Sequence, residues 1–138
     1  MKPCLMDSGF LYALIDDTDE HSKSVKNSLL EVYEEVILPV PAVTETAYFL
    51  SKNLGVEALA NFLENLPEMN VIFETPTAED YKRAAEVLRK YNDANIDFVD
   101  ALIVAIAERL NITKILTIDR RHFGIFKPNH CAAFEILP

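Results

Sequence analysis

The amino-acid sequence predicts an α/β protein, a three-layer α/β/α sandwich around a central, mostly parallel sheet of about five strands. Short apolar runs alternate along the 138 residues with longer segments of helical periodicity. Strands that alternate with helices form parallel sheets, because crossover helices must cover both faces. Half of the residues are hydrophobic and no repeat or Gly/Ser linker interrupts them, so we expect residues 1–138 to form a single domain.

The first half of the chain contains two expected strands and four expected helices. Their bounds are a strand at 3–6, helices at 8–15 and near 20–35, a strand at 36–39, and helices at 41–54 and 56–66. The second helix is predicted by an apolar series from Val25 to Val36 at spacings of four, three and four. Pro41 suits the first turn of the third helix, and Gly55 marks its end.

The second half continues the alternation. Its expected elements are a strand at 69–73, helices at 78–91 and 98–110, and strands at 114–118 and 133–137. Thr77 and Asp80 have the spacing of a capping box at the start of the first of these helices. Residues 98–110 are apolar nearly all round, which predicts a buried helix. Four phenylalanines are expected in the core, although an exposed part of this stripe could seat a partner helix: Phe10, Phe49, Phe62 and Phe98.

Charge and cysteine content restrict the possible functions. Asp and Glu number 22 against 13 Lys and Arg, and the formal charge of −9 disfavours nucleic-acid binding by phosphate neutralisation over a broad surface. A polyanionic substrate must therefore be bound locally, and the same charge suits a basic protein partner. Cys4 and Cys131 lack the spacing of a zinc site, and no apolar run approaches the roughly 18 residues of a membrane span. We expect a cytoplasmic protein with no membrane attachment.

Four acidic residues lie where predicted strands end or just inside the helices that follow: Asp7, Glu45, Asp100 and Asp119. Taken singly, each has a structural explanation as a helix cap, a first-turn acid, a turn residue or a solvated side chain. Taken together they favour a metal site, because ligands gather at the carboxyl edge of a parallel sheet. Mg²⁺ and Mn²⁺ prefer carboxylate oxygens, and such ions support phosphodiester hydrolysis. For the neighbouring Asp97, helix capping is the expected role.

Four short motifs contain these acids, and they are spread along the chain from residue 6 to residue 123. They are Met6-Asp7-Ser8-Gly9-Phe10-Leu11, Val43-Thr44-Glu45-Thr46, Asp97-Phe98-Val99-Asp100-Ala101-Leu102-Ile103 and Leu116-Thr117-Ile118-Asp119-Arg120-Arg121-His122-Phe123. In order and spacing the motifs resemble those of the PIN-domain nucleases, and among them the VapC-like toxin ribonucleases of toxin–antitoxin pairs. The resemblance implies a metal-dependent endoribonuclease that hydrolyses RNA phosphodiester bonds with Mg²⁺ or Mn²⁺.

The resemblance also implies roles for individual residues. Asp7 and Asp100 would bind a metal ion most directly, and Asp119 would join them directly or through water. Glu45 would orient water or help to hold a second ion. Three further residues would assist: Asp97, and the hydroxyls of Ser8 and Thr117, which would hydrogen-bond carboxylates or substrate. A helix-start serine and an ordinary strand residue are equally good explanations of these two hydroxyls.

The implied partners are an RNA substrate, a cognate antitoxin and a second copy of the chain in a homodimer. The helices at 41–54 and 56–66 are the expected dimer interface. His122 is expected in a loop, near substrate or as a local hydrogen-bond donor, and Arg120 and Arg121 as a solvated pair on a turn.

Other functions have less support. The first strand is followed by the single Asp7 and the single Gly9, not by the paired acids of phosphoaspartyl enzymes or the glycine-rich turn of dinucleotide-binding proteins. One alternative stays open: a PIN-like binding or scaffold module without catalysis, whose acids receive the arginines of a basic partner.

Overall fold

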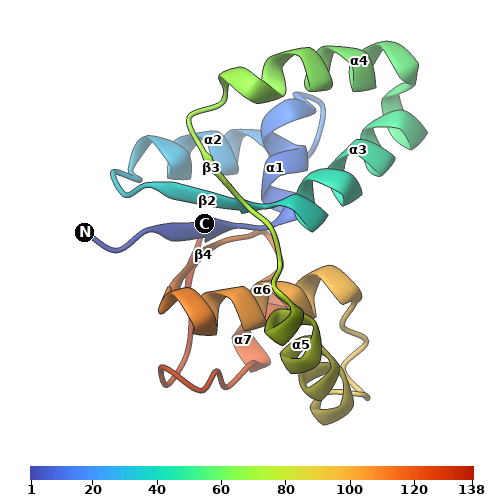
Figure 1. Ribbon diagram of the computed structural model, residues 1–138. Helices are drawn as coiled ribbons and strands as arrows, with labels where there is room; N and C mark the ends of the chain where they lie inside the picture. The colour runs from blue at the N-terminus through green and yellow to red at the C-terminus, as the bar shows by residue number, and fades with distance from the viewer.

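The computed structural model describes residues 1–138, and at its centre is a five-stranded sheet in which every strand pair is parallel (Figure 1). The strands are β1 (Cys4–Met6), β2 (Val36–Pro39), β3 (Ile72–Glu74), β4 (Lys114–Leu116) and β5 (Glu135–Leu137). Their order across the sheet is β3-β2-β1-β4-β5. The first strand therefore lies in the middle, and its carboxyl end is flanked by those of β2 and β4.

Helices cover both faces of the sheet. They are α1 (Ser8–Ile15), α2 (Ser22–Leu30), α3 (Val40–Leu54), α4 (Val56–Asn65), α5 (Ala78–Lys90), α6 (Phe98–Leu110) and α7 (Arg120–Ile125), with a short 3-10 helix at Leu66–Glu68. In Figure 1, α1 to α4 lie on one side of the sheet and α5 to α7 on the other. The predicted three-layer α/β/α sandwich is confirmed, and the sheet is entirely parallel.

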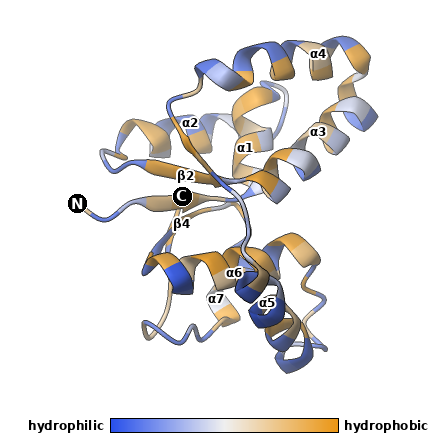
Figure 2. Cartoon of the chain, in the orientation of Figure 1, coloured by the Kyte–Doolittle hydropathy of each residue, from blue (hydrophilic) through white to orange (hydrophobic).

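The core is concentrated around β1 and α6. Cys4, Leu5 and Met6 of β1 are all buried, because helices pack on both faces of a parallel sheet. Along α6 every residue from Val99 to Ala107 is buried, as its apolar sequence predicts. Helix α5 packs against α6 and covers it from the solvent side. Its residues are mostly hydrophilic, whereas those of α6 are mostly hydrophobic (Figure 2).

Two helices begin with the same local structure. The Thr77 hydroxyl caps α5 by accepting from the N–H of Asp80, whose carboxylate accepts from the N–H of Thr77, as predicted. Asp97 and Asp100 form the same reciprocal pair at the start of α6. Each pair satisfies donors that a helix start leaves free. The second pair also fixes the position of one of the four predicted acids.

Several element boundaries differ from the predicted ones. Helix α2 ends at Leu30, not near 35, because the chain must turn before Val36 enters β2 beside β1. Strand β3 begins at Ile72, later than predicted, and β4 and β5 are shorter than predicted. Helix α7 was not predicted; Arg120 and Arg121 lie in its first turn.

The predicted core position is wrong for two of the four phenylalanines. Phe10 and Phe62 are buried, but the side chains of Phe49 and Phe98 are exposed, at 39% and 54%. Both lie on helix faces that no other part of the chain covers completely. No helix of the structure combines the length and the apolar character needed to cross a membrane.

Candidate active site

A pocket of about 360 Å³ lies beside the carboxyl ends of β1 and β4, and all four predicted acids line it. The lining residues are Asp7, Ser8, Gly9, Glu45, Phe49, Asp97, Asp100, Ile118, Asp119 and His122. They come from segments far apart in the sequence, which the parallel sheet brings to one edge. No lysine or arginine is among them, so the acidic side chains of the lining have no basic side chain to balance their charge.

Asp7 is held by hydrogen bonds at the end of β1. Its Oδ1 accepts from the N–H of Ser8 at 2.7 Å and lies 3.3 Å from the Ser8 hydroxyl oxygen, while Oδ2 accepts from the Thr117 hydroxyl at 2.9 Å. Its own N–H donates to the carbonyl of Leu116 in the neighbouring strand. These bonds fix the carboxylate in one orientation although it is almost fully buried.

Ser8 links Asp7 to Glu45 on α3. The Ser8 hydroxyl donates to Oε1 of Glu45 as well as lying 3.3 Å from Asp7. The buried hydroxyl of Thr46 donates to the carbonyl of Ser8 at 3.2 Å, which joins α3 to α1 at this point. Glu45 therefore faces the pocket although it lies on a helix that follows a different strand.

Asp100 lies in the first turn of α6. Its N–H donates to Oδ1 of Asp97 at 2.9 Å, and its Oδ2 accepts from the N–H of Asp97 at 3.2 Å. Asp97 acts as the cap, as expected from the sequence, and its side chain also lines the pocket. Asp100 is buried, with only 6% of its surface exposed.

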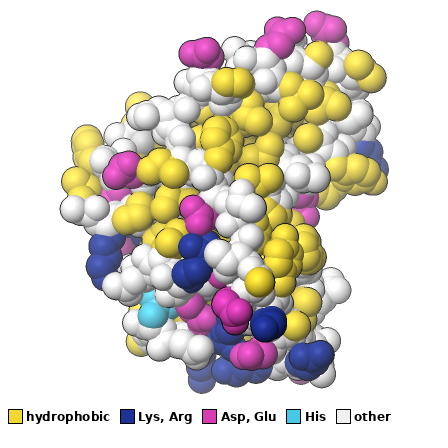
Figure 3. Space-filling view, in the orientation of Figure 1, with side chains coloured by type: hydrophobic (Ala, Val, Ile, Leu, Met, Phe, Trp, Pro, Cys, Tyr) yellow, Lys and Arg dark blue, Asp and Glu magenta, His cyan; other side chains and the backbone are white.

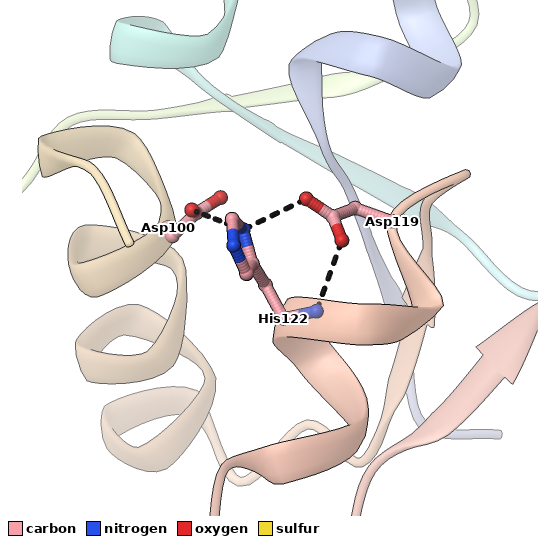
Figure 4. A group of neighbouring side chains, drawn as sticks. All are labelled: Asp100, Asp119 and His122. Atoms are coloured by element: carbon pink, nitrogen blue, oxygen red, sulfur yellow. Dashed lines mark hydrogen bonds and ion pairs between the residues drawn. The ribbon is translucent and has the colours of Figure 1, made fainter. Parts of the chain in front are cut away.

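Asp119 and His122 complete the pocket from α7 (Figure 4). Oδ1 of Asp119 accepts from the N–H of His122 at 2.9 Å, and the N–H of Asp119 donates to Thr117 Oγ1 at 3.0 Å. The imidazole of His122 lies between two carboxylates, with Nδ1 2.9 Å from Oδ2 of Asp119 and 3.3 Å from Oδ2 of Asp100. Neither contact has the geometry of a hydrogen bond.

His122 lines the pocket from helix α7 and not from the expected loop. Its contacts with Asp100 and Asp119 were not predicted, because they depend on the direction of a helix that the sequence did not reveal. The available signal was a histidine three residues after an acid that could cap a helix. Arg120 and Arg121 are both exposed, as expected of a solvated pair, and the guanidinium of Arg120 also donates to the backbone oxygens of Ile136 and Pro138.

Burial and mutual repulsion raise the pKa of three pocket acids. Burial raises the pKa of Asp7 to about 6, against the opposing hydrogen bonds from Thr117 and Ser8. Burial, with the nearby charges of Asp7 and Asp97, raises the pKa of Asp100 to about 8. The pKa of Glu45 is raised as well, by burial first. These carboxylates are costly to ionise together unless a positive charge joins them.

The donor atoms suit a hard divalent cation. Asp100, Asp119 and His122 each offer one ligand atom, and these atoms lie within 4.8 Å of one another. Asp7, which the sequence assigns as a direct ligand together with Asp100, lies outside this group. Carboxylate oxygens dominate the pocket, and the unpartnered Nδ1 of His122 faces them. Such an oxygen-rich set fits Mg²⁺ or Mn²⁺ better than a softer metal.

Comparison with known proteins agrees with the fold. Ribonuclease VapC26 of Mycobacterium tuberculosis is 27% identical over 134 residues, which cover 97% of this chain and 99% of that protein. The crystal structure of M. tuberculosis VapC20, described as a sarcin-ricin loop cleaving toxin, is similar with a TM-score of 0.84 at 20% identity, covering 98% of this chain and 99% of that one. A toxin–antitoxin complex from Klebsiella pneumoniae is similar with a TM-score of 0.68 at 15% identity, covering 89% and 92% of the two chains.

At such low identities the two solved structures establish the fold alone. The family is established by a separate finding, a match of residues 4–125 to the family model described as the PIN domain. That match runs from β1 to the end of α7 and contains every residue that lines the acidic pocket. The chain therefore belongs to the PIN domain family.

Proposed function

We propose that the protein is an endoribonuclease that hydrolyses RNA phosphodiester bonds with Mg²⁺ or Mn²⁺, and that it is the toxin of a toxin–antitoxin pair. The observation that carries the proposal is the gathering of Asp7, Glu45, Asp100 and Asp119 around one pocket without a lysine or arginine. A pocket of this charge repels an RNA phosphate by itself and attracts a divalent cation. Membership of the PIN domain family and the ribonuclease name of the similar VapC26 support the same activity.

In this proposal, Asp100 and Asp119 hold the cation together with Asp7, and Glu45 orients water or helps to hold a second ion. His122, beside Asp100 and Asp119, is an additional donor that the geometry adds to this set. A divalent cation at such a site supplies positive charge for the phosphodiester and lowers the pKa of water. The donor set supports a hard cation such as Mg²⁺ or Mn²⁺.

Three residues in or beside the pocket hold the carboxylates in position: Ser8, Asp97 and Thr117. Thr117 and Ser8 donate hydrogen bonds that favour the ionised form of Asp7 and hold it in place. Asp97 caps α6 and thereby fixes the backbone that carries Asp100. Because these donors are already aligned, the carboxylates need little reorganisation when a cation binds.

We propose one cognate antitoxin as the protein partner. Support comes from the K. pneumoniae toxin–antitoxin complex, to which the chain is similar in fold, and from the acidic pocket, which suits a basic side chain.

We further propose that the 138 residues act as a single domain in a homodimer, with α3 and α4 as the interface. Exposed Leu54, Val56 and Leu63 on these helices support that choice. Both cysteines are free thiols, which supports the reducing cytoplasm as the location.

The test is cleavage of a labelled single-stranded RNA by the purified protein. We expect cleavage with Mn²⁺ or Mg²⁺, none with a chelator, and none in Asp7→Asn or Asp100→Asn variants that keep the native circular dichroism spectrum. Full activity in both variants would refute the assignment of the site. Tight binding of a basic partner without cleavage under any metal would favour the scaffold alternative.

A further inference from the structure

A second cavity, of about 720 Å³, opens beside the acidic pocket. We call it the aromatic groove and define it by Glu45, Tyr48, Phe49, Thr75, Tyr81 and Phe98. It runs between α3 on one side and the starts of α5 and α6 on the other. Glu45 and Phe49 line both the groove and the acidic pocket, so a molecule lying in the groove reaches the proposed cleavage site.

The aromatic side chains of the groove are accessible to solvent. Tyr48, Tyr81 and Phe98 are 61%, 49% and 54% exposed. The rings of Tyr81 and Phe98 are nearly parallel, at an interplanar angle of 24° with centroids 6.4 Å apart. In Figure 3 hydrophobic side chains gather on the face between α3 and α5. Exposed apolar surface of this kind, next to a polar pocket, is typical of a binding site.

The charges around the groove restrict its ligand. Glu45 is the only charged residue in the lining, and no lysine or arginine contributes to it. The acidic pocket has no basic residue either, and the whole chain carries a formal charge of −9. The groove therefore cannot follow the phosphates of a nucleic acid. Within the groove and the acidic pocket, affinity for RNA beyond that of the cation must come from uncharged contacts, and stacking of bases on aromatic rings is one that exposed rings provide.

We propose that the aromatic groove binds unpaired nucleobases by stacking, next to the phosphodiester that is cut. The inference rests on the proposed ribonuclease function and assigns the surface that would hold the bases beside the cleaved bond. Bases inside a duplex cannot reach exposed rings, whereas those of loops and single strands can. Tyr81 and Phe98 provide the stacking surface, and Phe49 connects it to the acids.

The first experiment replaces each of two aromatic rings of the groove by an apolar side chain that cannot stack on a base. Tyr81→Leu and Phe98→Leu are compared with the native residues in an Asp7→Asn background, in which RNA is not cut. Binding of a short, fluorescently labelled single-stranded RNA is followed by anisotropy. Each variant is expected to bind about 5- to 150-fold more weakly for every stacked base that is lost. The matched control is Tyr33→Leu, because Tyr33 is 82% exposed and lines neither the groove nor the acidic pocket.

The second experiment removes bases from the RNA. Abasic positions near the cleavage site should weaken binding to the protein with native rings and cause no further loss in the Tyr81→Leu, Phe98→Leu double variant. Equal binding by native and double-variant proteins overturns the inference. So does a change from dimer to monomer in the leucine variants, measured by light scattering, because a second copy of the chain would then occupy the groove.

These outcomes are separate from failure of the proposed function. If the protein with native acids cuts no RNA with Mn²⁺ or Mg²⁺, the ribonuclease proposal fails. If that protein cuts RNA, and the leucine variants with intact Asp7 cut and bind it equally well, only the base-stacking inference fails.

Discussion

The hydroxyl of Thr117 donates a hydrogen bond of 2.9 Å to Oδ2 of Asp7, and both residues are buried where β4 and β1 end. The same hydroxyl oxygen accepts from the N–H of Asp119 at 3.0 Å. One side chain thus sets the positions of two pocket acids that are more than a hundred residues apart. This arrangement leads to the first prediction.

Replacing Thr117 by valine keeps the volume and removes the donor. The hydrogen bond from Thr117 lowers the pKa of Asp7, which burial raises to about 6, so the pKa of Asp7 should rise further in the variant. An acid must be ionised to bind a cation, and the acidic side of the pH–activity profile should move to higher pH at limiting Mn²⁺. The control is Thr46→Val, whose buried hydroxyl donates to a backbone carbonyl instead. An equal shift in both variants would contradict the explanation.

The pKa of Asp100 predicts how the stability of the metal-free protein depends on pH. Folding raises this pKa from 3.8 to about 8, so between these values the folded state binds more protons than the unfolded state. The free energy of unfolding should therefore fall as pH rises from about 4 to about 8. Thermal unfolding with a chelator should show this decline in the native protein, and a smaller decline in Asp100→Asn.

Adding Mn²⁺ at pH 8 should restore stability to the native protein and do less for the Asp100→Asn variant, because a cation relieves the repulsion between ionised acids. A melting temperature that does not change with pH or with Mn²⁺ would contradict the role given to Asp100.

Removing each of the two helix caps should lower stability, but only removing the cap of α6 should also lower activity. Thr77→Ala and Asp97→Ala each remove a helix cap, and each should cost about 1 kcal/mol of unfolding free energy. Only Asp97 is bonded to a pocket acid, so Asp97→Ala should also reduce cleavage, by roughly 100-fold if Asp100 moves by about 1 Å. Urea unfolding and initial cleavage rates measure the two effects. Equal rates in the two variants would show that the cap does not position Asp100.

An ion pair that does not line the pocket should affect stability alone. Burial would raise the pKa of Asp80, but Arg109 lowers it through Nε bonds of 3.0 and 3.1 Å to the carboxylate. Arg109→Met leaves Asp80 buried without its partner and should cost roughly 2–3 kcal/mol, below the range for a fully buried pair because Arg109 is partly exposed. Urea unfolding should reveal this loss, with RNA cleavage at the native rate when the variant is folded. Lys82→Ala, which breaks the exposed pair with Glu79, is the control and should change stability by less than about 1 kcal/mol.

Local sequence predicted the elements whose signals agree with one another. Helix α6 has the predicted bounds, because the pair Asp97 and Asp100 defines its start and a continuous apolar run follows. Asp7 and Asp119 could be placed at one edge because parallel strands end on the same side of a sheet. Glu45 could be placed near that edge because it lies early in the helix after a strand, but nothing in its own helix indicates which direction the side chain faces.

Other features depend on long-range packing that local patterns do not contain. Val32 and Val36 continue a helical spacing, yet the pairing of β2 with β1 ends the helix at Leu30. Helix α7 has six residues, with two arginines and a glycine, and lacks an apolar period. The contact of His122 with Asp100 could not be predicted without it. Phe98 resembled a core residue because its neighbours are buried, although its own ring faces the aromatic groove.

The central claim is that the folded chain gathers its pocket acids around a divalent cation. The most direct measurement is anomalous diffraction from a crystal soaked in Mn²⁺, recorded near the manganese absorption edge. We predict a peak between the carboxylates of Asp7, Asp100 and Asp119 that disappears in an Asp100→Asn crystal. A fully soaked crystal with an empty pocket, or with Mn²⁺ bound only elsewhere, would contradict the claim.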